Sequence, residues 1–68
     1  MVDSLRKAQD GTLEETLGES WTVAYSEEPA TGLWTAVVYK HDVIEWRSGG
    51  YASLEDARQA AEEFYKQV

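Results

Sequence analysis

The fold is decided by residues 21–68, which read WTVAYSEEPA TGLWTAVVYK HDVIEWRSGG YASLEDARQA AEEFYKQV. Apolar and polar residues alternate with a period of two over Trp21–Tyr25, which is typical of a strand with one buried face. Leu33–Tyr39 and Val43–Arg47 are rich in β-branched and aromatic residues, which favour strands. The sequence therefore predicts three strands in this region.

Two polar segments separate the three strands. Residues 27–32 contain Pro29, which cannot donate to a sheet ladder, and Gly32, which tolerates a positive φ. Residues 40–42 are few enough to form a tight turn between neighbouring strands. Both segments predict a chain reversal, so the strands form an antiparallel meander.

A helix is predicted after the glycines at 49 and 50. Ser53 is a favourable amino-terminal cap, with Asp56 in the reciprocal position of a capping box. Apolar residues then recur at helical spacing, at Leu54, Ala57, Ala61, Phe64 and Val68. Small alanines in the middle of this stripe let a helix approach the sheet closely. We expect the helix to lie across one sheet face.

The aromatic and aliphatic residues exceed what one helix can cover. Trp21, Tyr25, Trp34 and Trp46 can already fill the sheet face under the helix, with Ile44 on the same side as Trp46. The strand over residues 33–39 carries apolar residues on its other side too. We predict an apolar interface patch on the outer sheet face, formed by Leu33, Val37, Tyr39 and Val43.

Residues 1–18 are expected to form a partly mobile amino-terminal arm of short helical turns, followed by a β-β-β-α domain over residues 19–68. A first turn has Asp3 as cap, Leu5 and Ala8 as apolar positions and Gly11 as a stop. A second begins with a capping box at Thr12–Glu15 and ends at Gly18. Two alternatives remain for what covers the outer face: a second chain, or this arm through Leu5, Leu13 and Leu17.

Composition narrows the function classes. The chain has 68 residues, 13 acids against 6 bases, a formal net charge of −7 and no cysteine. Such a charge repels polyanions and suits solubility or a basic partner, and the lack of cysteine excludes disulfides and thiolate metal sites. Since neither a long apolar run nor a signal-peptide core is present, we expect a cytoplasmic protein without membrane contact.

No residue pattern predicts catalysis, a cofactor or a metal. His41 stands beside Asp42 in a predicted turn, and no hydroxyl has the sequence context of a nucleophile. Glu27 and Glu28 lack the ligand spacing of a calcium loop. Gly49 and Gly50 lack the lysine of a phosphate-binding loop. We therefore predict a protein that is not an enzyme.

One short motif resembles a known family. Residues at the third strand and the helix start have the spacing of the YegP-like family of small uncharacterised bacterial proteins, over about half of the chain: Ile44, Ser48, Gly50, Tyr51, Ser53 and Ala57, with Gly32 near a family glycine. The resemblance implies a strand-strand-strand-helix unit that is duplicated in one chain or paired between chains, and no known activity. The family tends to have Asn-Gly where this chain has His41-Asp42, and lysines where it is acidic.

Other families share the outline. Gly-x-Trp-x-Ala-Val from Gly32, followed by Ser-Leu-Glu-Asp-Ala from Ser53, is similar to HicB-type antitoxins, without their Pro-Gly-Cys element. The arm-type DNA-binding domains of phage integrases are similar in outline too, but their basic strands are missing here.

Together these patterns predict an α+β domain, in which a three-stranded antiparallel meander is packed by one carboxy-terminal helix. The leading function is a small acidic protein-binding module that forms a homodimer. A second hypothesis is an inhibitor or antitoxin-like protein that presents Glu27 and Glu28 to a basic protein, with imitation of nucleic-acid phosphates as one way of doing so. A third, weak nucleic-acid binding, requires Lys40, Arg47 and Arg58 to cluster.

Overall fold

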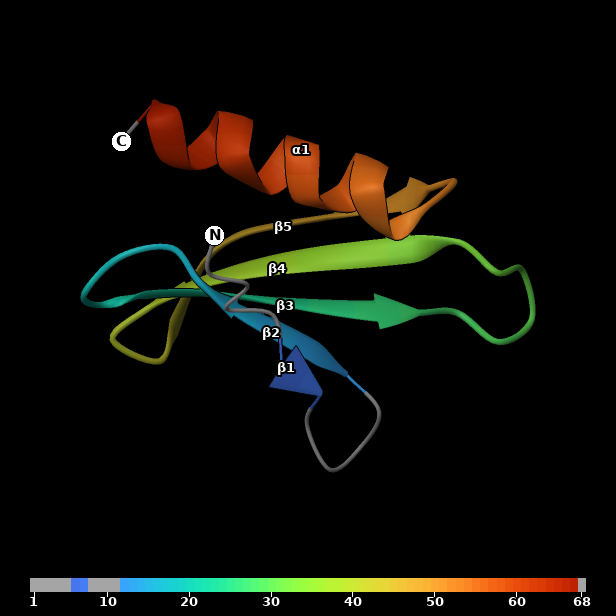
Figure 1. Cartoon of the computed structure of the whole chain (residues 1–68), viewed down its shortest axis with the longest axis horizontal. Coiled ribbons are helices and arrows are strands. Elements are labelled where there is room, and N and C mark those ends of the chain that lie inside the picture. The colour runs from blue at the N-terminus through green and yellow to red at the C-terminus, as the bar shows by residue number, and fades with distance from the viewer. Residues whose placement is uncertain (1–5, 8–11, 68) are drawn as a thin grey trace.

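The computed structural model describes residues 6–7 and 12–67, and it places one helix on one face of an antiparallel sheet (Figure 1). The elements in chain order are β1 (Arg6–Lys7), β2 (Leu13–Thr16), β3 (Trp21–Glu27), β4 (Trp34–Lys40), β5 (Val43–Tyr51) and α1 (Leu54–Lys66). Each strand pairs with the next in the chain. The predicted α+β class, with an antiparallel meander and a carboxy-terminal helix, is confirmed.

The number of strands was predicted incorrectly. Four strands have four or more residues, and the two-residue β1 extends the sheet beyond β2. The predicted capping box at Thr12–Glu15 and the turn ending at Gly18 are wrong, because Leu13–Thr16 pairs with β3 instead. The pairing satisfies backbone groups of β3 that a helical turn would leave without a partner.

The first predicted helical turn falls mostly outside the described residues. Asp3, Leu5, Ala8 and Gly11 all lie there, whereas Arg6–Lys7 between them is a strand and not a helix. Its register sets Arg6 opposite Glu14 and Lys7 opposite Leu13.

The helix begins where the sequence predicts. The Ser53 hydroxyl accepts a hydrogen bond from the backbone N–H of Asp56 at 3.2 Å, and acidic residues occupy the first turn while Lys66 occupies the last. Negative charge near the amino end and positive charge near the carboxyl end of the helix interact favourably with its dipole. Ala57 and Ala61 have no exposed surface, so the helix backbone sits close to the strands below it.

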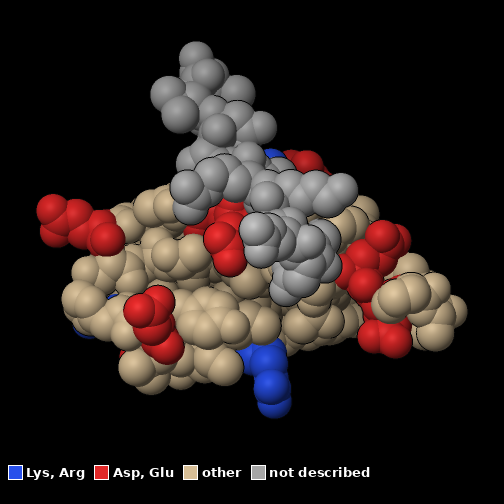
Figure 2. Space-filling view, turned by 90° about the horizontal axis from the view of Figure 1, so that it is seen from below, with Lys and Arg blue, Asp and Glu red and all other residues tan. Residues whose placement is uncertain are grey.

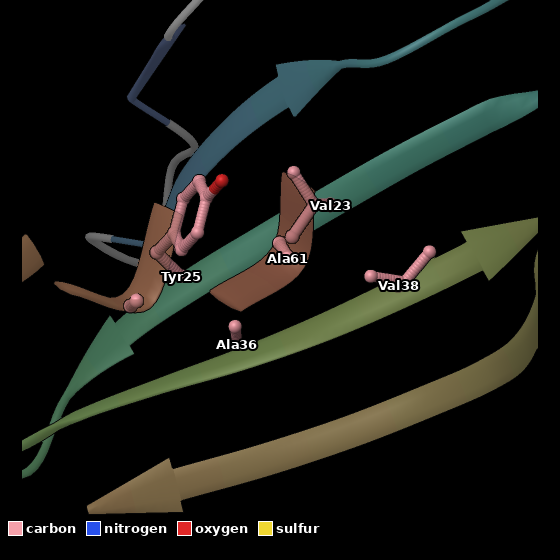
Figure 3. Close-up of a cluster of buried hydrophobic side chains, with 6 residues drawn as sticks. Val23, Tyr25, Ala36, Val38 and Ala61 are labelled. Carbon is pink, nitrogen blue, oxygen red and sulfur yellow. The ribbon is translucent and has the colours of Figure 1, made fainter. Parts of the chain in front are cut away.

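The core lies between α1 and the middle of the sheet. Its strand residues are completely buried: Val23 and Tyr25 of β3, and Ala36 and Val38 of β4. Figure 3 shows Val23, Tyr25, Ala36 and Val38 gathered around Ala61. In the described part of the chain, every buried side-chain nitrogen or oxygen has a hydrogen-bond partner, as native cores require.

Aromatic rings extend this core toward the carboxyl end of the helix. Trp46 stacks on Phe64 with a centroid distance of 5.3 Å. Trp21 meets Phe64 and Tyr65 edge-on, at 6.3 and 5.6 Å. Trp34 packs against the same core. The prediction that the three tryptophans and Tyr25 fill the face under the helix is therefore confirmed.

Both predicted chain reversals are present. Between β3 and β4 the amide of Gly32, at φ +74°, donates to the carbonyl of Glu28 at 2.7 Å. Between β4 and β5 only His41 and Asp42 remain outside the strands, and both have positive φ, 53° and 66°. Two-residue hairpins favour this geometry because it matches the strand twist, yet it suits glycine and asparagine better than the residues found here.

Replacing Asp42 by glycine should raise the free energy of unfolding by about 0.5 to 1 kcal/mol. Glycine relieves a steric cost of about 1–2 kcal/mol at positive φ, and its greater freedom in the unfolded chain offsets part of the gain. Urea unfolding followed by tryptophan fluorescence measures the difference. Asp42→Ala is the control, because it removes the same carboxylate and keeps Cβ, so it should not stabilise. Stabilisation by Asp42→Ala would assign the effect to charge and contradict the conformational explanation.

Candidate functional site

The sheet face opposite α1, here called the outer face, is the candidate interaction surface. Directly opposed residues in a sheet point to the same side, and neighbours along a strand alternate. Since Val23, Tyr25, Ala36 and Val38 point to α1, the residues between them point away. Across β2 to β5 the outer face comprises Glu14, Thr16, Thr22, Ala24, Ser26, Thr35, Val37, Tyr39, Ile44 and Arg47.

The outer face is largely uncharged. Figure 2 shows it with uncharged residues over most of the visible surface, and with acidic residues both at the margins and near the centre. Val37 and Tyr39 are half-buried, and Ile44 is 52% exposed. Among the described residues no helix or strand lies over this face, since α1 contacts the sheet from the other side (Figure 1).

The four predicted interface residues do not all share this face. Val37 and Tyr39 lie on it, whereas Val43 opposes Lys40, whose side of β4 faces α1. Leu33 lies in the loop directly before β4 and is 39% exposed. The structure therefore brings two of the four residues together.

Ile44 joins the outer face because β5 contains an irregularity. The register steps from Val38 opposite Trp46 to Tyr39 opposite Ile44, which leaves Glu45 as an extra residue. A bulge of this kind reverses the side on which the following side chains lie. The prediction that Ile44 lies beside Trp46 under the helix is thus wrong, and simple alternation gives no signal for such a bulge.

The amino-terminal leucines do not supply the predicted cover in the described part of the chain. Leu13 and Leu17 pack against the core under α1. Leu5 lies outside the described residues.

A second group of side chains connects β2 to α1, and sequence analysis missed it. Glu15 lies on the helix side of β2, opposite Val23. Its Oε1 accepts a hydrogen bond from the Tyr25 hydroxyl at 2.9 Å, and its Oε2 pairs with Nη2 of Arg58 at 2.8 Å. In Figure 3 the hydroxyl of Tyr25 points toward β2. Arg58 thus reaches from α1 across to the sheet.

Burial and hydrogen bonding set the protonation states of this cluster. Burial raises the pKa of Tyr25 well above its ordinary value, and its hydrogen bond to Glu15 adds to the rise. The hydrogen bond to Glu15 also raises the pKa of Arg58. Tyr25 therefore stays neutral and Arg58 charged near neutral pH. Both carboxylate oxygens of Glu15 are bonded, so the cluster ties β2 to β3 and α1.

An open groove of about 550 Å³ runs beside this cluster, between β2 and the carboxyl half of α1. It is lined by Glu15, Thr16, Leu17, Glu62, Tyr65 and Lys66. Within residues 6–7 and 12–67 no three His, Cys, Asp or Glu side chains are close enough to hold a metal ion. The same part of the chain has no helix with the length and hydropathy that spanning a membrane requires.

The predicted acidic surface lies at one end of the molecule. Glu27 ends β3 and Glu28 follows it in the loop, and both are exposed. Glu27 opposes Trp34, which in turn opposes Tyr51, just before the helix begins. The exposed acids of the first helical turn, Glu55 and Asp56, are thus at the same end of the fold as this loop (Figure 1).

The basic residues that a nucleic-acid site would need are dispersed. Lys40 places its Nζ over the Trp21 ring at 5.3 Å on the helix side. Arg47 lies on the outer face opposite Val37, and Arg58 is paired with Glu15. This arrangement gives no support to a phosphate-binding groove.

The stability of the wild-type protein should fall in alkali more steeply than that of a Tyr25→Phe variant. The pKa of Tyr25 is higher in the folded protein than in the unfolded chain. Protonated Tyr25 therefore stabilises the folded state, and this contribution to the free energy of unfolding is lost as pH rises above the unfolded-state pKa. From about pH 8 to about pH 11 the wild type should lose about 1.4 kcal/mol more, because the unfolded chain releases this proton near its ordinary pKa of about 10.

Urea unfolding at each pH measures this difference. Tyr39→Phe is the matched control, because within the described residues the Tyr39 hydroxyl makes no hydrogen bond, and its profile should follow the wild type. Parallel profiles for wild type and Tyr25→Phe would contradict the assigned role of Tyr25.

No family model, curated protein or solved structure matches this chain. The resemblance to the YegP-like family stays a prediction from the residues quoted above.

Proposed function

We propose that this chain is a small acidic, non-enzymatic protein-binding module, and that it associates with itself through the outer face of its sheet. The supporting observation is the position of Val37, Tyr39 and Ile44 on one face that no other described element covers. Small threonine and alanine residues beside them leave room for a partner's side chains. Apolar surface of this kind on a small domain is typical of an interface.

The size of the face sets the expected strength. Four strands about 4.8 Å apart and roughly seven residues long make a face of roughly 450 Å². Two such faces bury roughly 900 Å², which is below the range of about 1,200–2,000 Å² for standard stable complexes. We therefore expect a dissociation constant in the micromolar range, with monomer and dimer in exchange.

The sheet edge is a less suitable surface than the face. β5 has β4 as its one strand neighbour among the described residues, which leaves its other edge available. However, the register of β5 shifts at two places, between Trp34 and Ala36 and between Val38 and Tyr39 of its partner strand. Such bulges and charged residues on an edge hinder regular pairing with another strand.

Val37→Lys should weaken self-association, because it places an ammonium group in the middle of the outer face. The change reduces the net negative charge, so added repulsion between protomers cannot explain a loss. Sedimentation velocity over a concentration series should show at least about tenfold weaker association, which corresponds to about 1.4 kcal/mol.

Val43→Lys is the matched control for this experiment. It makes the same chemical change in the same sheet, at a residue that is 59% exposed and on the side of α1. It should leave association unchanged. A wild-type protein that stays monomeric at millimolar concentration, or equal effects of both substitutions, would contradict the proposal.

A second candidate function uses the acidic end of the molecule against a basic protein, as an inhibitor or antitoxin-like protein would. Its supporting observation is the common location of four exposed acids: one at the end of β3, one in the loop that follows, and two on the first turn of α1. The net charge of −7 would steer a cationic partner toward this chain.

Glu27→Gln/Glu28→Gln should weaken the binding of an arginine-rich probe peptide, measured by titration calorimetry. The paired variant Glu62→Gln/Glu63→Gln is the control, because it removes the same charge from two adjacent exposed residues elsewhere on α1. Binding should also fall steeply from about 50 to about 300 mM salt, because screening strengthens. Equal losses for both variants would assign binding to overall charge and remove this candidate.

A further inference from the structure

From β2 to β5, one row of residues on the outer face has an acid on β2 and a base on β5. Glu14 of β2 opposes Ala24 of β3, Ala24 opposes Val37 of β4, and Val37 opposes Arg47 of β5. The row thus runs from an acid through two apolar residues to a base. Its apolar pair lies at the centre of the face, between β3 and β4.

We propose that two copies of this chain pack outer face to outer face about a two-fold axis that runs parallel to the strands between β3 and β4. This inference rests on the proposed function and specifies its partner. Such an axis reverses the order of the strands in the second copy while keeping the row in place. Glu14 of each copy then lies over Arg47 of the other, so one contact becomes two by symmetry.

Residue size follows the same symmetry. Under this axis the small Ala24 faces the larger Val37 of the second copy. In the next row Thr22 opposes Tyr39 within the chain, and the axis places Thr22 over Tyr39 of the second copy. In both rows a small residue of β3 receives a larger one of β4. Interdigitation of this kind fills the space of about 10 Å between packed sheets.

The charged residues favour this axis over its main alternative. A two-fold axis across the strands would place Glu14 over Glu14 and Arg47 over Arg47, and opposed like charges cost several kcal/mol. In the described part of the chain neither residue has an ion pair, since the one pair there joins Arg58 to Glu15. Both charges are therefore available to a second copy.

Charge exchange between the two positions tests the axis by sedimentation equilibrium on the full chain. Glu14→Arg and Arg47→Glu should each weaken self-association at least about tenfold, because each creates two like-charge contacts. The first changes the net charge from −7 to −5, since replacing a −1 residue by a +1 residue adds 2, so general repulsion cannot explain its effect. The double variant should return to within about threefold of the wild type.

Mixing the two single variants gives a sharper result. From β2 to β5, the row of the Glu14→Arg variant has two bases, and the same row of the Arg47→Glu variant has two acids. The mixed dimer therefore restores both acid–base contacts and should form with near wild-type affinity. The backbone register sets Arg6 opposite Glu14, so every variant with arginine at position 14 has two bases opposed within one chain. A loss of association in Glu14→Arg alone could come from this neighbour, whereas recovery in the double variant and in the mixture occurs despite it. Thermal unfolding of each variant checks that the fold is kept.

The outcomes separate this inference from the proposed function. The outer face is the interface if the wild type and Val43→Lys dimerise and Val37→Lys does not. If neither the double variant nor the mixture then recovers association, the proposed axis is wrong. If the wild type is monomeric at millimolar concentration, both fail. Recovery in the double variant and in the mixture supports the stated axis.

Discussion

The close approach of α1 to the centre of the sheet is the constraint on which the structure depends. Ala57 and Ala61 carry no side chain beyond Cβ, and both are completely buried over β3 and β4. Because they bring the helix axis near the strands, the aromatic rings of Trp21, Trp46 and Phe64 fit around the contact and not within it. Larger residues at either alanine would cause overpacking, which costs about 1–3 kcal/mol in well-packed cores.

This arrangement commits one sheet face to the core and leaves the other face out of contact with α1. Residues that alternate along β3 and β4 belong to opposite sides, so Tyr39 and Val37 cannot join the core without a change of register. The chain therefore keeps apolar residues on a surface that its own helix does not reach. In a domain of this size such residues give little stability to a single chain, whereas under the proposed self-association their burial would contribute to the dimer.

The sequence predicted those elements whose periodicity extends over several residues. The three strands from Trp21 onward and the helix from Ser53 each have a clear period, and the structure contains all four. β2 has only four residues, and Leu13 and Glu15 alone mark its inward side. A glutamate at an inward position looks like a break in the pattern. It is tolerated because Tyr25 and Arg58 satisfy both of its oxygens, and these partners are distant in sequence.

The site was only partly predictable for a similar reason. Val37 and Tyr39 were placed correctly by alternation along one strand, whereas Val43 and Ile44 were exchanged between sides by a single bulged residue, Glu45. Backbone irregularities of this kind come from pairing with the neighbouring strand, which a linear pattern does not encode.

The tie between Glu15 and Arg58 joins residues 43 positions apart, and it has a consequence for how the protein is made. During synthesis Glu15 precedes both of its side-chain partners: first Tyr25 of β3, and last the arginine of α1. The carboxylate of Glu15 can therefore gain its full set of partners only after residue 58 has been made, although its own strand is among the first segments of the chain.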